Sequence, residues 1–355
     1  MSGSTYGTLY SITTWGESHG SAIGVTVDGC PAGLSLSAED IQTFLNRRKP
    51  GQSRFTTPRK EADQVEILSG VFEGRTTGTP ISLIVYNQNQ RSKDYSDIKN
   101  YYRPGHADYT FDEKYGFRDY RGGGRSSGRE TIGRVAAGAI ASLILKELGI
   151  SVFAYTKSIG NIVIPEEDYH YEQINENKLY MPNNVYAEKA SAYLDHCMEK
   201  QDSSGGIIEC IVTGMPAGIG DPVFNKLDAR LAASIMSIGA VKGFEIGDGF
   251  GVSVANGSTN NDNFTLENGK VTKKTNHAGG ILGGMSDGSP IILRAAVKPT
   301  PSIASMQETI TQNHEPTSIQ IKGRHDPVIV PRAVVVVESM TAITLVDLLF
   351  TNMSA

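Results

Sequence analysis

Cysteine is scarce in this chain of 355 residues and occurs only at Cys30, Cys197 and Cys210. The three are far apart and odd in number, and no CxxC pair is present, so the sequence indicates neither a disulfide framework nor a zinc site. No two histidines have a metal-ligand spacing such as HExxH, and we therefore expect no metal. Unpaired thiols are typical of a reducing compartment, which favours the cytoplasm.

An excess of positive charge is also missing. The chain has 33 Lys and Arg against 38 Asp and Glu, a formal net charge of −5, so no global field favours nucleic acid or an anionic membrane as a partner. No uninterrupted apolar run approaches the roughly 18 residues of a membrane span. The first twenty residues lack a basic segment followed by an apolar one. We therefore expect neither a transmembrane helix nor a signal peptide.

Regular elements of both kinds are indicated along the chain. No linker or low-complexity tract divides it, so we expect residues 1–355 to form a single domain. Ser37 with Asp40, and Ser127 with Glu130, resemble capping boxes that begin helices. Further helices are predicted to begin at Asp221 and to cover 187–200 and 339–350. Strands are predicted over 21–28, 80–86, 206–213, 250–255, 291–297 and 333–338. This mixture predicts an α/β or α+β fold.

A short internal echo links two of these strands. The segment 29–33 (GCPAG) follows the strand 21–28, and the segment 214–218 (GMPAG) follows the strand 206–213. Two readings stay open: GxPAG is a good strand-to-helix turn that arose twice, or the chain contains an internal duplication with two similar halves.

Glycine makes up 39 of the 355 residues, about 11% against a usual value near 7%. One cluster, Gly122 to Gly124, leads through Arg125 into the predicted helix. A glycine-rich loop that feeds a helix N-terminus presents free N–H groups to an anion, and Arg125 and Arg129 would add charge-assisted hydrogen bonds. We interpret this loop as a phosphate site, although it has neither the Walker A nor the GxGxxG spacing.

A second basic run covers residues 47–60 and holds six cations without an acid. In a chain that is acidic overall, such a run indicates a local anion site. A solvated helix end explains Arg47 and Lys49 equally well.

Three histidines are candidates for proton transfer. His19 and His106 lie in glycine-bounded turns, and His325 lies in the segment KGRHDP. Histidine is the side chain that most readily exchanges a proton near neutral pH. Each of the three could also be structural.

Two further features are ambiguous. The glycine cluster at 279–284 could let backbone lie against a flat ring, or it could be a tight β-turn region. Asp347 falls on an otherwise apolar helical face, where a buried carboxylate needs a partner or a raised pKa. It is therefore either a candidate for proton transfer or an acid at a helix end.

Taken together, these segments resemble the chorismate synthase family along nearly the whole chain. The matching stretches are GESHG (16–20), RRKPGQSR (47–54), RPGHADYTF (103–111), RGGGRSSGRET (121–131), AVKGFEIGDGF (240–250), NHAGGILGGMSDG (276–288), KPTPSI (298–303) and KGRHDP (322–327). Many long motifs in the same order make the resemblance specific. It implies an α+β fold, a β-α-β sandwich, assembled as a homotetramer.

The resemblance also implies an activity. Such enzymes remove phosphate and a ring proton from 5-enolpyruvylshikimate 3-phosphate in a 1,4-elimination that gives chorismate. Reduced FMN is required although there is no net redox change. The resemblance implies catalytic roles for His19, His106, Asp347, Ser18 and Ser127. It implies substrate binding by Arg48, Arg54, Arg103, Arg129 and Arg332. It implies FMN contacts from Arg125, Ser126, Ser127, Gly239, Ala240, Gly283, Lys298, Pro299, Thr300, Pro301, Ser302 and Arg324.

Two departures from the family pattern stand out: Gly239 where Asn is common, so that only backbone can contact flavin there, and Gly128 where Ala is common. The chain lacks the insertions of family members that reduce their own flavin with NADPH, so we expect an external flavin reductase as a partner. The rival functions are a flavin oxidoreductase that passes hydride to the substrate, and a non-catalytic phosphate- or nucleotide-binding module.

Overall fold

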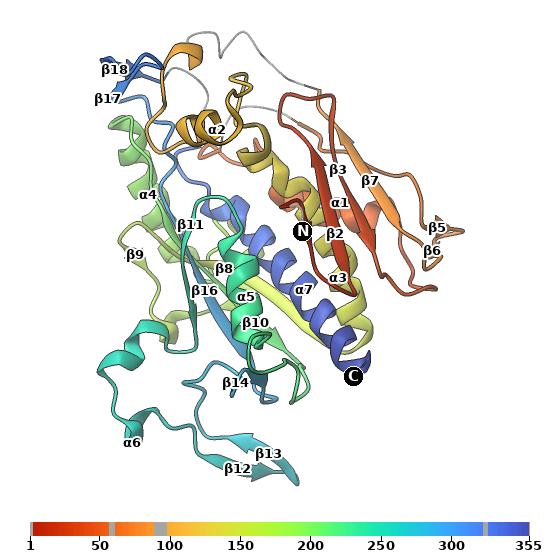
Figure 1. Ribbon diagram of the computed structural model, residues 1–355. Coiled ribbons are helices and arrows are strands. Elements are labelled where there is room, and N and C mark those ends of the chain that lie inside the picture. The colour runs from red at the N-terminus through yellow and green to blue at the C-terminus, as the bar shows by residue number, and fades with distance from the viewer. Residues whose placement is uncertain (1–2, 57–60, 89–97, 322–325, 355) are drawn as a thin grey trace.

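The computed structural model describes residues 3–56, 61–88, 98–321 and 326–354. Two five-stranded antiparallel sheets enclose a layer of helices (Figure 1). The first sheet has the order β1 (Thr5–Tyr6), β2 (Ser11–Gly16), β3 (Ala22–Asp28), β7 (Ile81–Tyr86), β4 (Val65–Ile67). The second has the order β11 (Val241–Ile246), β16 (Ile291–Val297), β10 (Gly206–Thr213), β8 (Ser151–Ile159), β9 (Ile162–Val163). The expected α+β sandwich is therefore confirmed.

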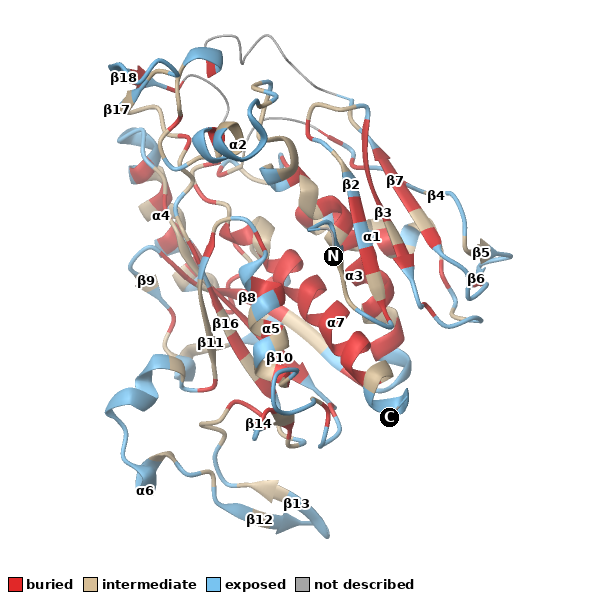
Figure 2. Cartoon of the chain, viewed as in Figure 1, coloured by how far each residue is buried: buried red, intermediate tan, exposed pale blue. Residues whose placement is uncertain are grey.

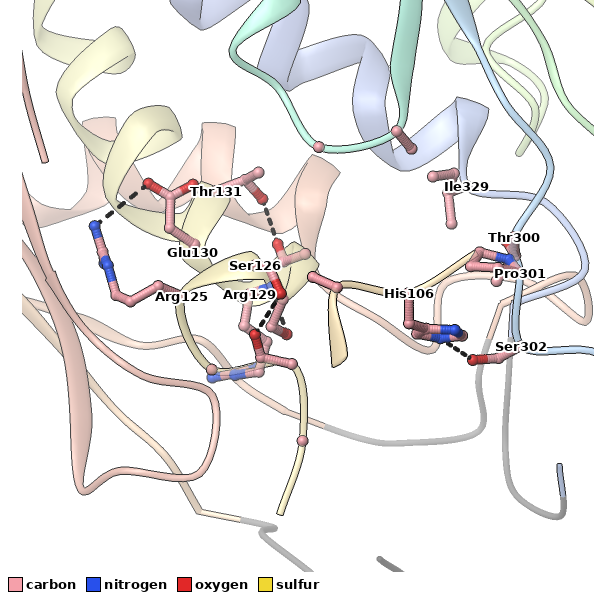
Figure 3. Close-up of a pocket in the computed structure, with 18 of the residues that line it drawn as sticks. His106, Arg125, Ser126, Arg129, Glu130, Thr131, Thr300, Pro301, Ser302 and Ile329 are labelled. Atoms are coloured by element: carbon pink, nitrogen blue, oxygen red, sulfur yellow. Dashed lines mark hydrogen bonds and ion pairs between the residues drawn. The ribbon is translucent and has the colours of Figure 1, made fainter. Parts of the chain in front are cut away.

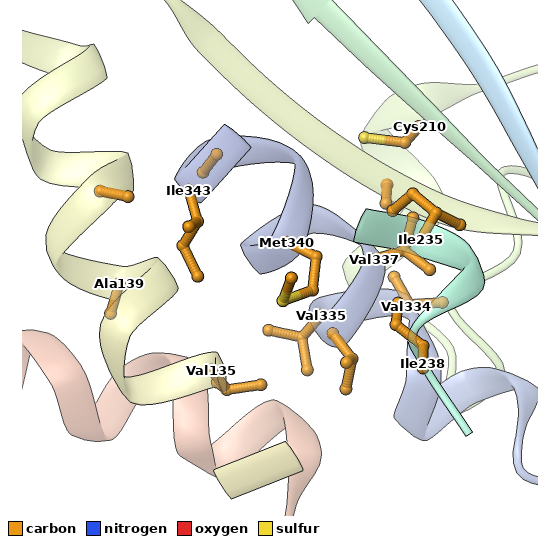
Figure 4. Close-up of a cluster of buried hydrophobic side chains, with 14 of the residues drawn as sticks. Val135, Ala139, Cys210, Ile235, Ile238, Val334, Val335, Val337, Met340 and Ile343 are labelled. Carbon is orange, nitrogen blue, oxygen red and sulfur yellow. The ribbon is translucent and has the colours of Figure 1, made fainter. Parts of the chain in front are cut away.

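The middle layer contains α1 (Ala38–Arg48), α3 (Thr131–Glu147), α5 (Leu227–Met236) and α7 (Val330–Ser354). Helix α7 lies between α3 and the second sheet, and its residues from Val334 to Leu349 are all buried (Figures 2 and 4). A Cβ at Gly138 of α3 would overlap Ser339 of α7, so the missing side chain lets the two helices approach closely. By length and hydropathy α7 could span a membrane, but 89% of its most apolar window is buried inside the protein.

The remaining helices are α2 (Asp108–Tyr115), α4 (Asn184–Glu199) and α6 (Gly257–Asn260), and the short 3-10 helices include η2 (Gly124–Ser126), η3 (Gly128–Glu130), η4 (Glu166–Asp168), η5 (Tyr171–Asn175) and η6 (Gly249–Val254). The hairpins are β5–β6 (Val71–Phe72, Arg75–Thr76), β12–β13 (Phe264–Glu267, Lys270–Lys273), β14–β15 (Ile281–Leu282, Met285–Ser286) and β17–β18 (Met306–Ile310, Pro316–Gln320).

The two halves repeat one plan. The strand order β2-β3-β7-β4 of the first sheet corresponds to β8-β10-β16-β11 of the second. In each half the GxPAG turn is held by a hairpin hydroxyl: Thr76 Oγ1 donates to the Pro31 carbonyl at 2.6 Å, and Ser286 Oγ donates to the Pro216 carbonyl at 2.5 Å. If the turn had arisen twice independently, we would not expect the same contact with a hairpin hydroxyl in both halves. The structure therefore favours the internal duplication.

Several predicted elements are corrected. The predicted strand 333–338 is part of α7, and the predicted strand 250–255 is the 3-10 helix η6. The helix expected to begin at Asp221 begins at Leu227. The capping box at Ser37 and Asp40 is confirmed, with both reciprocal hydrogen bonds present. Ser127 accepts from the Arg129 N–H as predicted, but Glu130 does not complete a box: it accepts from Thr14 and from Arg134.

Candidate active site

One cavity of about 1250 Å³ opens where the helix layer meets the loops that follow both sheets. It is lined by the loop after β2, the loop that precedes α2, the glycine-rich loop before α3, the turn between α5 and β11, the loop after β16 and the start of α7. Figure 3 shows Arg125, Ser126 and Arg129 on one side of the cavity and His106 and Ser302 on the other. Because ligand sites usually occupy about 300–1,000 Å³, this cavity can hold two molecules of moderate size.

The glycine-rich loop forms one wall. Gly122 and Gly124 have backbone φ angles of +155° and +50°, which residues with a side chain rarely adopt. The chain then passes through η2 and η3 into α3. Ser127 Oγ caps the turn by accepting from the Arg129 N–H. The start of a helix thus faces the cavity, an arrangement that attracts anions.

Positive charge dominates the lining. Nine Lys or Arg side chains line the cavity, against five Asp or Glu. The cations are Arg48, Arg103, Arg118, Arg125, Arg129, Arg134, Lys242, Lys298 and Arg332. In a chain with a net charge of −5, this local excess indicates a site for a strongly anionic molecule.

Three of the arginines share one region. Arg48 and Arg129 are both buried, and each makes an ion pair with the carboxylate of Asp63. Burial lowers the pKa of Arg48 to about 9, against the opposing effect of Asp63. Arg332 donates from Nε to the Arg48 carbonyl and from Nη1 to Asp326.

The other arginines are held individually. Arg103 forms a fork with Asp108, with its Nε and Nη2 each donating to one carboxylate oxygen at 2.8 and 2.7 Å. Arg125 donates to the Gly16 carbonyl and to Thr14, which ties the glycine-rich loop to β2. These guanidinium groups are oriented before any ligand binds, so little rotamer entropy is lost on binding.

His19 lies beside the glycine-rich loop. Its Nδ1 is 3.1 Å from the hydroxyl of Ser18, a buried side chain. A Cβ at Gly122 would overlap the His19 ring and lie close to Ser18 Oγ. The glycine thus leaves the space in which the imidazole sits.

His106 lies on the opposite wall. Its Nδ1 is 3.0 Å from the Pro104 carbonyl, which can only accept, so Nδ1 carries a proton. Its Nε2 is 2.8 Å from Ser302 Oγ and accepts from that hydroxyl when the ring is neutral. Burial, reinforced by the charge of Arg103, lowers the pKa of His106 to about 4. The ring is therefore neutral at pH 7.

Comparison with known proteins now identifies the family. The chorismate synthase family model matches residues 10–350. The chain is 66% identical over 355 residues to the chorismate synthase of Agathobacter rectalis, covering 100% of this chain and 97% of that protein. It is 50% identical over 367 residues to the chorismate synthase of Methanococcus vannielii, and the match covers 98% of this chain and 96% of that protein. The chain belongs to the chorismate synthase family.

A crystal structure of a chorismate synthase also matches, with a TM-score of 0.77 and 32% identity over 97% of this chain and 92% of that one. The family resemblance read from the sequence motifs is thereby confirmed, and with it the assignment of the chain as an enzyme.

The structure brings most of the site residues expected from the family together. His19, His106, Ser127, Arg48, Arg103, Arg129 and Arg332 line the cavity, as do Arg125, Ser126, Gly239, Ala240, Lys298, Thr300, Pro301 and Ser302. Ser18 does not line the cavity, but its hydroxyl is hydrogen-bonded to His19 Nδ1. Arg324 and His325 lie outside the described residues.

Of the expected residues that the structure describes, five do not line the cavity: Ser18, Arg54, Gly283, Pro299 and Asp347. Arg54 makes an exposed ion pair with Asp195 of α4 at 2.7 Å. Gly283 lies in the β14–β15 turn, and Pro299 lies between two lining residues without lining the cavity itself.

Asp347 is held by contacts away from the cavity. Its buried carboxylate accepts from the backbone N–H groups of Thr8, Leu9 and Tyr10 and from the guanidinium of Arg230. Oδ1 accepts the three backbone hydrogen bonds and so holds the turn between β1 and β2, while Oδ2 accepts from Arg230. These contacts favour a structural role for Asp347 over the expected proton-transfer role.

Sequence reasoning missed some lining residues. Asp326 is a carboxylate at the cavity next to Arg332, and the quoted KGRHDP segment was a signal that could have found it. Phe111, Tyr115 and Phe117 contribute apolar surface at the cavity, and Phe117 is largely exposed. Aromatic residues in and directly after a short helix carry no comparable signal.

Proposed function

We propose that this enzyme catalyses the chorismate synthase reaction, the 1,4-elimination of phosphate and a ring proton from 5-enolpyruvylshikimate 3-phosphate, as the last step of the shikimate pathway in the cytoplasm. The observation that carries the proposal is that one cavity unites His19 and His106 with four arginines, in a chain of this family. Those arginines are Arg48, Arg103, Arg129 and Arg332.

The charge of the cavity suits this substrate. A phosphate and two carboxylates require several cations to remove them from water, and guanidinium forks match their oxygens. The same cations would stabilise the charge that develops on the departing phosphate. His19, which lies beside the anion-binding loop, would donate a hydrogen bond or a proton to that phosphate.

The lining also fits reduced FMN. Within the described part of the chain, Arg129 Nη2 and Thr300 Oγ1 are buried polar atoms without a hydrogen-bond partner, as expected where a ligand supplies one. A Cβ at Gly105 would crowd Pro301, so close packing shapes this wall. Arg125, Ser126, Ser127 and the loop 298–302 would hold the cofactor. Bound reduced flavin would lend electron density to the substrate and recover it, which leaves no net redox change.

His106 would enter the reaction as a neutral ring. The same contacts that fix its tautomer place the basic Nε2 against the Ser302 hydroxyl. An anionic ligand in the cavity would raise the pKa of His106 by favouring the charged ring, and the histidine could then deliver a proton towards the flavin.

The reduced flavin would come from an external reductase, because the chain lacks the insertions of family members that reduce their own flavin. The purified protein should therefore not oxidise NADPH in the presence of FMN. NADPH-dependent FMN reduction by the pure protein would contradict this part of the proposal.

A homotetramer is also proposed. Residues 249–273 form an arm that extends from the second sheet (Figure 1), and large apolar side chains on it are exposed, including Phe250, Val254, Phe264 and Leu266. Apolar surface of this kind usually marks a protein contact. Light scattering should give the mass of four chains, and the double substitution Phe264→Ser and Leu266→Ser should reduce this mass. Phe224→Ser changes an exposed apolar residue outside the arm and should leave the mass unchanged. A monomeric mass for the unmodified chain would contradict the proposal.

The decisive experiment is anaerobic. Purified protein, dithionite-reduced FMN and 5-enolpyruvylshikimate 3-phosphate are mixed, and chorismate absorbance and phosphate release are followed together. Equal amounts of both products with the flavin still reduced would support the lyase. Stoichiometric flavin oxidation would instead favour the oxidoreductase, and binding without any turnover would favour the non-catalytic module.

A further inference from the structure

Asp63 lies behind the cavity wall, in the segment that leads into β4. Its side chain has no exposed surface. Oδ2 is 2.8 Å from Arg48 Nη1, and Oδ1 is 3.1 Å from Arg129 Nη1. One carboxylate therefore bridges two guanidinium groups that come from the end of α1 and from the glycine-rich loop.

The backbone of Asp63 is held in an unusual conformation. Its φ of +46° lies in the left-handed region, which residues other than glycine rarely adopt. Gln42 of α1 fixes it there, since its side chain donates to the Asp63 carbonyl at 3.2 Å and accepts from the Val65 N–H at 3.1 Å. Strain of this kind persists where surrounding contacts require it, and it is often found at functional sites.

The two arginines differ in the donors that they have left. Arg48 also donates from Nε to Thr131 and from Nη2 to the Gly128 carbonyl, so each of its nitrogens has a protein partner. Arg129 donates from Nε to Asn87, but its Nη2 is buried and has no hydrogen-bond partner within the described residues. Arg129 thus keeps one buried nitrogen open, in a side chain that lines the cavity.

Charge makes the bridge necessary. Arg48, Arg129 and Arg332 repel one another in a region with little water. Burial alone would raise the pKa of Asp63, but Arg48 and Arg129 outweigh burial and lower it, so the carboxylate is ionised at neutral pH. Without this anion, Asn87 would be the one remaining hydrogen-bond partner of the Arg129 guanidinium among the described residues.

We propose that Asp63 is a positioning residue that fixes Arg129, with Arg48 as a brace, so that Nη2 of Arg129 contacts an anionic oxygen of the substrate. This inference deepens the proposed function and rests on it for the identity of that anion. The contact itself requires only an anion in the cavity.

Inorganic phosphate tests the contact without turnover. Asp63→Asn removes a negative charge near the cavity, so charge balance alone predicts tighter phosphate binding. Loss of positioning predicts the opposite, a Kd higher by about tenfold or more. Titration calorimetry of the full chain at constant pH and salt therefore decides by the sign of the change. Tighter or unchanged binding in Asp63→Asn, or no binding by the unmodified chain, would overturn the proposal.

Asp63→Glu provides a second test, which also serves if Asp63→Asn fails to fold. It keeps the charge but adds a methylene at a side chain that has no exposed surface. Positioning predicts weaker phosphate binding for Asp63→Glu, whereas charge balance predicts no change. An unchanged Kd would overturn the proposal.

Enzyme kinetics then separate positioning from a general structural role. In the anaerobic assay, kcat/KM of Asp63→Asn should fall by about 10²-fold, mostly through KM. Asp63→Asn should add little to Arg129→Met, because both remove the same contact. Additive losses would show that Asp63 does not act through Arg129.

Glu245→Gln, which breaks an ion pair with Arg294 outside the cavity, is the matched control and should leave kcat/KM unchanged. Inactivity of the unmodified chain would refute the proposed function but leave the phosphate comparison valid.

Discussion

The Nε2 of His106 and the hydroxyl of Ser302 lie 2.8 Å apart, although 196 positions separate the two residues in the chain. Since Nδ1 donates to the Pro104 carbonyl, the ring has one tautomer and one orientation. Both contacts are made by a neutral ring, in which Nε2 accepts and Ser302 donates. These two contacts therefore hold His106 as a neutral base when no ligand is bound.

This arrangement predicts a dependence of stability on pH. The pKa of His106 is lowered to about 4 from an ordinary value of 6.5, so the unfolded chain binds the proton more readily than the folded one. The corresponding stability is present above pH 6.5 and is lost as the pH falls towards 4, by about 3 kcal/mol. Urea unfolding at pH 7.0 and 4.5 should show that His106→Asn loses less stability than the unmodified chain. An equal loss in both proteins would contradict the prediction.

The Ser302 hydroxyl should matter for activity. Ser302→Ala removes the hydrogen-bond donor to His106 Nε2, and a hydrogen bond of this kind is worth about 1 kcal/mol. We therefore expect kcat/KM in the anaerobic assay to fall by roughly fivefold. Ser305→Ala is the control, because the Ser305 hydroxyl donates to backbone carbonyls outside the cavity. Equal effects of the two substitutions would argue against a role of the His106 contact.

Asp347 should prove structural. Its carboxylate is buried against three backbone N–H groups and Arg230, and removing one partner of a buried ion pair is destabilising by about 3 kcal/mol or more. Asp347→Asn should lower the free energy of unfolding in urea by this amount, while kcat of the folded fraction stays within about threefold of the unmodified enzyme. Normal stability combined with a loss of kcat would restore the proton-transfer role.

Local elements were the most predictable part of the fold. The capping box at Ser37 and the apolar strands 206–213 and 291–297 contain their own signals, because the cap and the alternation lie within a few residues. The valines at 334–337 predicted a strand, since β-branched residues favour strands. They form a helix because α7 is surrounded by α3, α5 and the second sheet, and burial on every side outweighs the propensity.

The site was predictable where its residues lie in dense motifs. The glycine-rich loop, the basic run and the turns that contain His19 and His106 stood out by composition, and the family resemblance added the cofactor. Asp63 gave no signal, because it is one acid among many until the fold places it between Arg48 and Arg129. Asp347 was ambiguous, because an acid on an apolar helical face indicates burial without indicating what the carboxylate contacts.

Two glycines that precede α3, Gly122 and Gly128, allow a matched comparison. A Cβ at Gly122 would overlap the ring of His19, and its φ of +155° disfavours a side chain. A Cβ at Gly128 would meet nothing within 4 Å, and this glycine begins the turn that leads into α3.

Gly122→Ala should therefore displace His19 and lower kcat/KM by about 10²-fold, because small misplacements of a catalytic group have effects of that size. Gly128→Ala should leave kcat/KM unchanged and raise the free energy of unfolding by about 0.4–1 kcal/mol through the lower entropy of the unfolded chain. Both are measured by the anaerobic assay and by urea unfolding. If Gly122→Ala kept full activity, the space beside His19 would have no part in catalysis, and the role of His19 at the leaving phosphate would have to be abandoned.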